Sequence, residues 1–437
     1  MNGLPEGALS GVKILDLTWV LSGPYASMVL CDLGAEVIKV ERPPYGDVAR
    51  TTGPFLSKQQ ATGNRQQGEE GNGGMPGRGP ESSYFFSINR GKKSTLLDLR
   101  KPEGRELFLR LVEQVDVVME NFTPGTMERL GLGYEALAAR NPRVIYSATS
   151  GFGQTGPDRD KPALDVVVQG MGGVMSITGE EGGAPVRPGL SLGDIAAGLF
   201  TAIGVLAALQ ERERSGRGQM IDISMLDCQV AVLENAFARY SATGEAPKAI
   251  GTRHPLSTPF QAFPTADGYI VIALGFGLEN IWGLFCATID LPELIDDARF
   301  QTPAERTRNH ATLEPLLNEA LRGQTTSHWV REFEAIQLPC GPLNSIPEVA
   351  AYPQVVSRGM LREVESSRGN RLTIADSPLR LSRTPGAIRG GPPGAGEHTR
   401  EVLEALLGMS AGEIEAAYAA GAAVEGRELP GEITGAG

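Results

Sequence analysis

The chain contains little cysteine: four residues in 437, spaced far apart. No two of them form a C-x-x-C pair, so the sequence excludes a disulfide-dense secreted scaffold. The first eleven residues also lack the basic-then-apolar order of a secretory signal. We therefore expect a protein of a reducing compartment, the cytoplasm. The cysteines are Cys31, Cys228, Cys286 and Cys340.

Positive charge is also scarce. Forty Lys and Arg residues stand against 52 Asp and Glu residues, which gives a net charge of -12. Such a chain lacks the broad basic surface on which nucleic-acid and anionic-membrane binding depend, so we expect neither partner. Long hydrophobic runs are missing as well. The most prominent apolar run, residues 195–209, has 15 residues, which is too short to span a bilayer and predicts a buried helix.

What the chain does have is a regular alternation of strand and helix patterns. This alternation is typical of an α/β fold with a doubly wound, Rossmann-like parallel sheet. Ligands of such sheets bind beyond the carboxyl ends of the strands. The expected strands cover residues 12–17, 36–41, 94–99, 115–120, 143–149 and 220–224.

The length predicts two or three domains. We place a large domain at residues 1–215, a linker and a smaller mixed α/β domain at 216–330, and a C-terminal segment at 331–437. Residues 58–82 are dominated by Gly, Gln, Asn, Glu and Arg, with scarcely any large apolar side chain. This composition predicts a disordered surface insertion within the large domain.

One motif resembles a binding site for a nicotinamide dinucleotide, but the residues that follow it argue against such a site. Residues 151–156 read GFGQTG, which matches the dinucleotide fingerprint and follows an expected strand. The fingerprint requires a helix to open at its last glycine, yet residues 157–162 contain two prolines and alternating charges. We therefore interpret the motif as a Gly-rich surface turn and not as a nicotinamide site.

Asp194 stands where a Gly-containing approach meets the start of the helix expected at residues 195–209. A carboxylate at the positive end of a helix dipole stays ionised. An ionised, firmly held carboxylate can attack an acyl group and carry it as an anhydride. Aspartate is also among the commonest helix caps, so from its position alone Asp194 has two interpretations, nucleophile and cap.

The order of several short motifs over the whole chain resembles class III CoA-transferases, a family that includes formyl-CoA transferases, carnitine CoA-transferases and α-methylacyl-CoA racemases. Each motif alone is weak, but their succession is specific. They are GVKILDLT at 11–18, DLGAEVIKVER at 32–42, ENFTPG at 120–125, SGFGQTGP at 150–157, LGD at 192–194, TPFQAF at 258–263 and GEHT at 396–399.

The resemblance implies that Asp194 is the catalytic nucleophile, supported by Gly193 and by the carboxylate of Asp165. It implies a mechanism through aspartyl anhydride and aspartyl-CoA thioester intermediates that needs neither a metal nor a tightly bound cofactor. Coenzyme A is then a substrate. For Asp165, a plain helix cap is the alternative interpretation.

Eight positions match CoA contacts of the family, and guanidinium groups among them suit bidentate phosphate binding. Without the resemblance, the same residues would pass for ordinary core and surface positions. The eight are Leu21, Ser22, Arg42, Leu97, Arg100, Asn121, Phe122 and Arg129. Arg253 and His254 are expected near the acyl group. The basic run at residues 90–93 is expected to be a solvated loop, with contact to CoA phosphate as the alternative.

Departures from the family patterns narrow the expected activity. Racemases carry a histidine immediately before the position of Asp165, where this chain has Leu164, and formyl-CoA transferases carry a glutamine at Leu21. The subgroup that remains, which this chain resembles, uses succinyl-CoA with small dicarboxylates. Two alternatives stay open: an acyl-CoA racemase or isomerase, and a non-catalytic CoA-binding subunit of a hetero-oligomer.

The family fold implies a large domain built from both chain ends, with the C-terminal segment returning to it. It also implies a homodimer whose two chains interlock like linked rings. Some members of the family pair two related chains, so the resemblance leaves a related partner subunit as the alternative.

Overall fold

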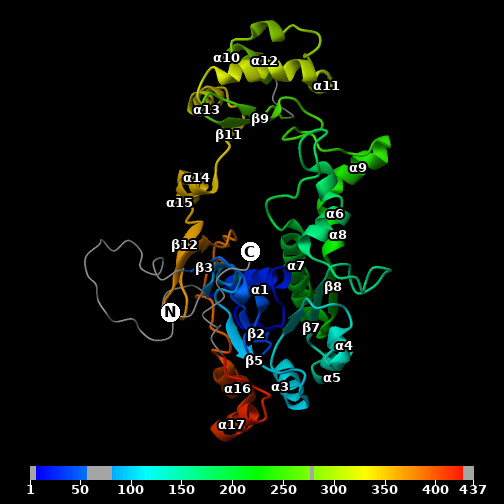
Figure 1. The fold of residues 1–437 in the computed structure, drawn as a ribbon, viewed down its shortest axis with the longest axis vertical. Helices are drawn as coiled ribbons and strands as arrows, with labels where there is room; N and C mark the ends of the chain where they lie inside the picture. Colours follow the sequence, from blue (N-terminus) through cyan, green and yellow to red (C-terminus); the bar gives the residue numbers. More distant parts are fainter. Residues whose placement is uncertain (1–5, 57–80, 276–279, 427–437) are drawn as a thin grey trace, which may run out of the picture. The chain divides into compact units, whose positions relative to one another are not determined.

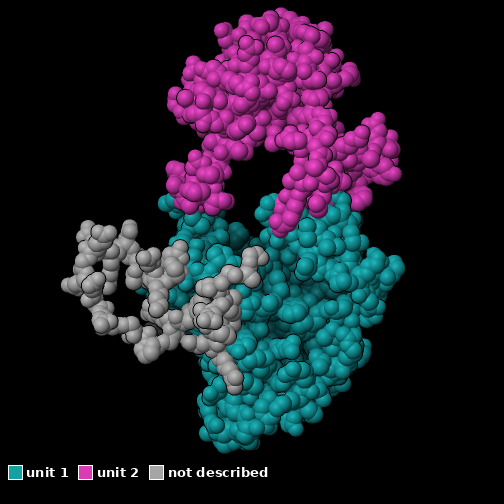
Figure 2. All heavy atoms as spheres, viewed as in Figure 1, with its two compact units in different colours: residues 1–173, 189–234, 356–437 teal, residues 174–188, 235–355 magenta. Residues whose placement is uncertain are grey.

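The computed structural model describes residues 6–56, 81–275 and 280–426. They form two compact units, coloured separately in Figure 2. Unit 1 comprises residues 1–173, 189–234 and 356–437, and unit 2 comprises residues 174–188 and 235–355. The divisions at 234/235 and 355/356 lie later than the boundaries placed at 215/216 and 330/331. The reason is that β8 (Met220–Ser224) belongs to the large sheet, while β11 (Cys340–Pro342) pairs within unit 2.

Unit 1 contains a six-stranded sheet in the order β5-β2-β1-β6-β7-β8, in which every pairing is parallel (Figure 1). The order reverses between β1 and β6, which is the switch point at which doubly wound sheets bind ligands. The predicted α/β fold with a large parallel sheet is thus confirmed. The strands are β1 (Lys13–Asp16), β2 (Glu36–Glu41), β5 (Lys93–Leu96), β6 (Val117–Glu120), β7 (Ile145–Ser150) and β8.

Alternate residues of the central strands supply two separate cores, as the two-residue period of a strand requires. Ile14 and Val37 pack with helices α1 (Ser22–Asp32) and α7 (Leu192–Ser215) on one face. The neighbouring Leu15 and Ile38 pack on the other face. That second face is covered by helices from both ends of the chain: α3 (Pro102–Val112), α5 (Tyr134–Arg140), α16 (Thr399–Leu407) and α17 (Ala411–Ala419).

Helix α7 is longer than the apolar run predicted, because its last turns continue through charged residues. It has 24 residues, and its most apolar window has a mean hydropathy of 1.9. By length and composition alone it could cross a membrane, so the expectation that the run is too short does not hold for the helix. The core helices of soluble proteins meet the same criteria of length and composition, and α7 packs on the sheet.

Unit 2 has its own core, built on a three-stranded antiparallel sheet in the order β11-β10-β9. Buried aromatic side chains fill this core, among them Phe263, Phe285 and Phe333. The remaining elements around the sheet are β9 (Phe260–Pro264), β10 (Tyr269–Ala273), α10 (Ile281–Thr288), α11 (Pro303–Arg308), α12 (His310–Arg322) and α13 (Thr326–Ala335).

Shorter elements complete the two units. They are η1 (Val48–Thr51), β3 (Phe55–Leu56), β4 (Glu81–Ser82), α2 (Ser83–Ile88), α4 (Thr126–Arg129), α6 (Asp165–Met171), η2 (Val174–Ile177), α8 (Met225–Val232), α9 (Glu234–Thr243), η3 (Pro292–Leu294), α14 (Ile346–Ala351), α15 (Pro353–Ser357), β12 (Leu361–Glu365) and β13 (Arg371–Ala375).

Most of the predicted disordered insertion, residues 58–80, lies outside the described residues. Its last two residues do not fit the prediction, because both are buried and form strand β4 opposite β3. Glu81 accepts hydrogen bonds from the Ser366 hydroxyl and the Asn370 amide, both at 2.8 Å. The Ser82 hydroxyl accepts from the Phe85 N–H and caps α2. Local composition could not reveal these partners from the C-terminal part of the chain.

Candidate active site

The first turn of helix α7 places Asp194 at the positive end of a long helix dipole. The helix begins at Leu192 with Ser191 as its N-cap, so Asp194 is the third helical residue and not the cap. The side chain is half-buried. A carboxylate in the first turn is stabilised in its charged form, which is the state that a nucleophile needs.

Asp165 caps this helix from a neighbouring element. It is the first residue of α6, it is buried, and its Oδ1 accepts the backbone N–H groups of Gly193 at 2.9 Å and Asp194 at 3.4 Å. Gln169 donates to the other carboxylate oxygen at 2.8 Å. A Cβ added to Gly193 would stand 3.0 Å from Asp165 Oδ1, which explains the glycine. The structure therefore brings Asp165, Gly193 and Asp194 together.

Tyr84 on helix α2 shares the electrostatic surroundings of these carboxylates. Burial, followed by the negative charges of Asp194, Asp47 and Asp165, raises the pKa of Tyr84 to about 12. The phenol therefore stays neutral to a higher pH than an ordinary tyrosine and can donate a hydrogen bond. Sequence analysis missed it, because the residues that reveal its role lie on other elements.

A cavity of about 430 Å³ opens at the carboxyl edge of the sheet. Its walls come from the segments that follow β1, β2, β5 and β6, on both sides of the switch point. This is the position at which parallel sheets bind ligands. The lining residues are Leu17, Thr18, Trp19, Val40, Glu41, Arg42, Gly46, Asp47, Leu97, Asp98, Leu99, Arg100, Phe122, Thr123, Thr126 and Leu130.

Half of the eight predicted CoA positions line this cavity: Arg42, Leu97, Arg100 and Phe122. The Arg100 guanidinium is held by a bidentate ion pair with Asp98, at 2.8 and 2.7 Å.

The other four predicted positions are not among the lining residues. Arg129 donates to the hydroxyl of Thr126, which does line the cavity. Leu21 is buried as the N-cap residue of α1. Asn121 bonds both backbone groups of Trp19 at 2.9 Å and the Ser22 hydroxyl at 3.3 Å. The Asn121 side chain thus contacts the backbone of the cavity wall and does not line the cavity itself.

Trp19 is a cavity residue that sequence analysis missed. Its indole is 46% exposed and packs edge-on against Phe122, with ring centroids 6.2 Å apart. The two rings give the cavity an aromatic wall suited to a flat, apolar group. A lone tryptophan just after the first strand is the signal that could have found it.

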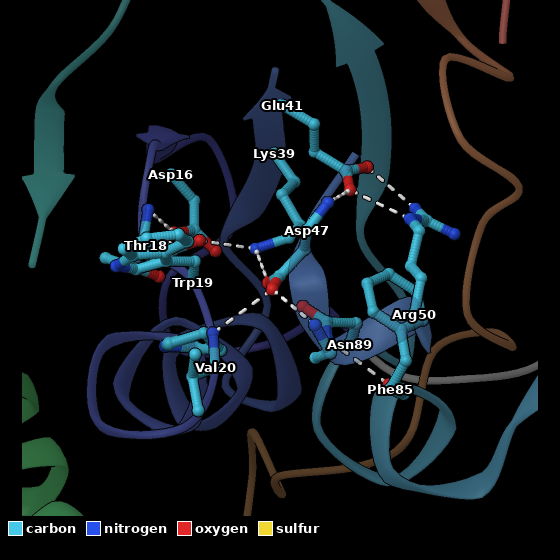
Figure 3. Close-up of polar contacts among 12 residues, drawn as sticks. Asp16, Thr18, Trp19, Val20, Lys39, Glu41, Asp47, Arg50, Phe85 and Asn89 are labelled. Atoms are coloured by element: carbon cyan, nitrogen blue, oxygen red, sulfur yellow. Dashed lines mark hydrogen bonds and ion pairs between the residues drawn. The ribbon is translucent and has the colours of Figure 1, made fainter. Parts of the chain in front are cut away.

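A cluster of buried charges adjoins the cavity, and two of its members, Glu41 and Asp47, are among the lining residues (Figure 3). Lys92 pairs with Asp16 at 3.1 Å and Lys39 pairs with Asp47 at 2.9 Å, and all four side chains are at most 1% exposed. Arg50 donates two hydrogen bonds to the Glu41 carboxylate, of 2.8 and 2.7 Å.

Burial and the neighbouring charges shift the pKa values of this cluster in opposite directions. Burial alone would raise the pKa of Asp16, but the charges of Lys92 and Lys39 and hydrogen bonds from Ser27 and Thr18 outweigh it and hold that pKa below its usual range. For Lys92, burial outweighs the attraction of Asp16 and lowers its pKa to about 8.

The structure overturns the expectation of a solvated basic loop at residues 90–93. Arg90 is buried in an ion pair with Asp32 at 2.7 Å, and Lys92 is buried against Asp16. Lys93 is partly exposed and pairs with Glu36 at 2.7 Å. The run looked solvated because its acidic partners are distant in sequence.

Glu120, at the end of β6, is buried beneath the Phe122 backbone and the Tyr146 hydroxyl, which donate to it at 2.6 and 3.2 Å. Burial outweighs these bonds and raises the pKa of Glu120 to about 8, against 4.5 for the unperturbed group. A raised folded-state pKa contributes stability below pH 4.5 that is lost as the pH rises through 8. We expect the unfolding free energy to fall by on the order of a few kcal/mol from about pH 5 to 9.

In Glu120→Gln this fall should largely disappear, because the amide has no proton to lose while it can still accept the Phe122 N–H. Thermal unfolding measured from pH 5 to 9 checks this. Glu135→Gln, a neutralisation at an exposed position, should keep the pH dependence of the original chain. An unchanged slope in Glu120→Gln would contradict the assignment.

Unit 2 contains a second cavity, of about 500 Å³, to which Arg253 contributes. Arg253 forms an ion pair with Glu181, and His254 packs on the Phe260 ring with centroids 4.8 Å apart. His254 is not among the cavity's lining residues. Asp194 belongs to unit 1, so the expectation that Arg253 and His254 lie near the acyl group remains a prediction.

No group of three or more His, Cys, Asp or Glu side chains that could hold a metal ion occurs in the part of the chain that the structure describes. All four cysteines fall within that part as free thiols, and three of them are buried.

The segment after Gly151 forms turns, and the next helix, α6, begins at Asp165. This agrees with the surface turn expected there.

Comparisons with known proteins agree with the motifs. CoA-transferase family III matches residues 9–399. Succinyl-CoA:glutarate CoA-transferase from Homo sapiens is 39% identical over 399 residues, which cover 91% of this chain and 86% of that protein. Acetyl-CoA:oxalate CoA-transferase from Acetobacter aceti is 42% identical over 358 residues, covering 82% and 86%. The crystal structure of a CAIB/BAIF family protein from Brucella suis superposes with a TM-score of 0.78 at 37% identity, covering 92% and 100%.

The protein is therefore a CoA-transferase. More specifically, the chain belongs to CoA-transferase family III, as the motif order predicted. CoA-transferases use CoA thioesters as substrates, so coenzyme A enters the reaction as a reactant.

Proposed function

We propose that this enzyme moves CoA from succinyl-CoA to a small carboxylic acid, in particular a dicarboxylic acid, with Asp194 as the nucleophile. The observation that carries the proposal is the arrangement at the start of α7, where the buried Asp165 fixes the turn that presents Asp194. The names of the two relatives, with glutarate and oxalate as acids, support a dicarboxylate acceptor.

In the first half of the proposed reaction, a carboxylate oxygen of Asp194 attacks the thioester carbonyl and the carbon–sulfur bond breaks. CoA leaves as the thiolate, and a mixed anhydride of succinate and Asp194 remains. The thiolate then attacks the aspartyl carbonyl and releases succinate, which leaves an aspartyl-CoA thioester. The thioester energy is retained, so the cycle needs neither ATP nor a tightly bound cofactor.

In the second half, the carboxylate of the acceptor attacks the aspartyl-CoA thioester and releases the CoA thiolate again. A second anhydride joins the acceptor to Asp194. The thiolate attacks the acceptor's acyl carbon, and the products are the new acyl-CoA and the free Asp194 carboxylate. Peptide dipoles at the start of α7 stabilise this leaving carboxylate.

The cavity at the switch point is the proposed CoA site. Arg42 and Arg100 on its wall suit the phosphates, and Trp19 and Phe122 offer a flat surface for the adenine. Leu21, Ser22, Asn121 and Arg129 are proposed to act from behind this wall, by shaping it.

An acceptor panel tests the function. Enzyme, succinyl-CoA and individual C2 to C6 mono- and dicarboxylic acids are incubated, and the new acyl-CoA is identified by mass spectrometry. Transfer to at least one dicarboxylate is expected. Exchange of the α-proton of a branched acyl-CoA without any transfer would favour the racemase or isomerase instead. Activity that appears only with a related second chain would favour the non-catalytic subunit.

We also propose that the enzyme is a homodimer, because three neighbouring helices of unit 1 expose large apolar side chains. On α7 these side chains are spaced by four and three residues and so share one face: Leu199, Ile203 and Leu206. The neighbouring helices α6 and α8 add Val166, Val167, Met171, Val230 and Val232. A monomer seldom leaves so much apolar surface in water, and a second copy presents a matching surface by symmetry.

Ile203→Asp should disrupt this dimer, because it buries a charge at a residue that is 58% exposed in the single chain. After unfolding and refolding, sedimentation velocity should show mainly monomer for Ile203→Asp and mainly dimer for the original protein. Glu213→Lys changes the charge of an exposed residue near the end of α7 and should leave the dimer intact. A dimeric Ile203→Asp variant would contradict the proposed interface.

The interlocked arrangement is proposed from the family resemblance, and it has its own test. Two threaded chains cannot separate without unfolding. Tagged and untagged dimers mixed under native conditions should therefore form no mixed dimers over a day, whereas unfolding and refolding them together should produce mixed dimers.

We further propose a reducing, cytoplasmic location, supported by the four free cysteines.

A further inference from the structure

The segment that joins β1 to α1 contains a strained residue at the rim of the proposed CoA cavity. Val20 has a φ of 63°, in the left-handed region that β-branched residues rarely adopt. Such a conformation persists only where its surroundings impose it, and it often marks a functional segment. Trp19, the residue before it, forms part of the cavity wall.

Side chains from three other segments hold the backbone of this loop in place. Lys39 Nζ donates to the Thr18 carbonyl at 2.5 Å. Asn121 accepts from the Trp19 N–H and donates to the Trp19 carbonyl, both at 2.9 Å. Asp47 accepts the N–H of Val20 at 3.2 Å. Figure 3 shows how Lys39 and Asp47 approach the loop.

Three contacts hold Asp47 itself in place. Its carboxylate is 1% exposed and pairs with Lys39 at 2.9 Å, and its Oδ1 also accepts the Ala49 N–H at 2.9 Å. Its backbone N–H donates to Glu41 at 2.7 Å. Because these contacts restrict the Asp47 side chain, its carboxylate can hold the strained Val20 peptide in one orientation.

We propose that Asp47 is a positioning residue for CoA: it keeps Val20 left-handed and thereby holds Trp19 against Phe122 in the cavity wall. The inference rests on the proposed function of this cavity. Although Asp47 is among the lining residues, its proposed effect runs through the loop. A glycine at position 20 should therefore make it dispensable, because glycine adopts positive φ without strain.

The test compares CoA affinity, measured by calorimetry, in Asp47→Asn, Val20→Gly and the double variant. Asp47→Asn turns its carbonyl oxygen toward the Lys39 ammonium and its NH2 group toward the Val20 N–H, and should raise the Kd for CoA by roughly tenfold. Val20→Gly alone should bind within about threefold of the original protein. In the double variant the Kd should recover to within about threefold, while the melting temperature stays low because Lys39 still lacks its anion.

A purely structural role for Asp47 predicts a different result, since glycine at position 20 cannot repair a lost ion pair. Failure of the double variant to recover CoA affinity would therefore overturn the proposal, as would an unchanged Kd in Asp47→Asn. Should Asp47→Asn not fold, Asp47→Glu keeps the charge but displaces the carboxylate, and the same recovery by Val20→Gly is expected. Asp32→Asn, which breaks another buried ion pair, should lower the melting temperature without changing the Kd.

A second measurement needs no ligand. Backbone hydrogen exchange of residues 17–25 should be at least about tenfold faster in Asp47→Asn, because the amide of Val20 loses its acceptor. Unchanged exchange would overturn the positioning role. Arg42→Ala separates the two proposals: if it binds CoA as tightly as the original protein, the cavity assignment fails, and the exchange measurement still decides whether Asp47 holds the loop.

Discussion

Replacing Asp194 by alanine is expected to abolish CoA transfer, with kcat reduced by at least about 10³-fold, because no other carboxylate in the first turn of α7 can take up the acyl group. Binding of CoA to the cavity should survive, since Asp194 does not line it. Steady-state rates with succinyl-CoA, and a separate CoA titration, measure the two effects. Activity within about tenfold of the original enzyme would reduce Asp194 to a structural residue.

Asp227 provides a matched control for this variant. It is the third residue of helix α8, just as Asp194 is the third residue of α7, and it is exposed. Asp227→Ala loses the same favourable interaction with a helix dipole, typically below about 1 kcal/mol, and should retain activity. In addition, incubation with the donor and hydroxylamine should modify Asp194 in the original enzyme. Modification of a different carboxylate would contradict the mechanism.

Lys92→Met should destabilise unit 1 by about 3–5 kcal/mol, because it leaves the buried Asp16 carboxylate without its cation. The loss is large because both side chains are fully buried and Asp16 cannot recover hydration. Urea unfolding, followed by circular dichroism, measures it as a shift of the midpoint.

Two comparisons separate this effect from the loss of any salt bridge. Lys161→Met breaks an exposed pair with Asp158 and should cost less than about 1 kcal/mol. The double variant Lys92→Met with Asp16→Asn removes both charges and should be more stable than Lys92→Met alone. A double variant less stable than the single one would show that Asp16 contributes chiefly through Ser27 and Thr18.

The sequence predicted the parallel sheet well, and for a physical reason. β-Branched residues recur within residues 36–41 and 220–224, and a glycine-containing turn precedes each run, so both were bounded as the structure has them. The motif order likewise led to Asp194 and Asp165. Local patterns do not reveal which distant residues meet, and this is why the burial of Lys39 and Lys92 went unrecognised. Each ammonium is compensated by an aspartate that reaches it only through the fold.

The same limit applies to the CoA positions. Arg42, Leu97, Arg100 and Phe122 follow strands and reach the cavity directly, whereas Asn121 turns its amide to the Trp19 backbone. Whether a polar residue faces a ligand or braces a neighbouring loop depends on side-chain direction, which a motif does not encode.

Helices α16 and α17 complete the core on one face of the large sheet, although the strands they cover were made several hundred residues earlier in the chain. During synthesis, part of this apolar face of the sheet therefore stays exposed until translation is almost finished. Synthesis that stops shortly before α16 should release a polypeptide that needs chaperones and aggregates, even though it already contains Asp194 and every strand of that sheet.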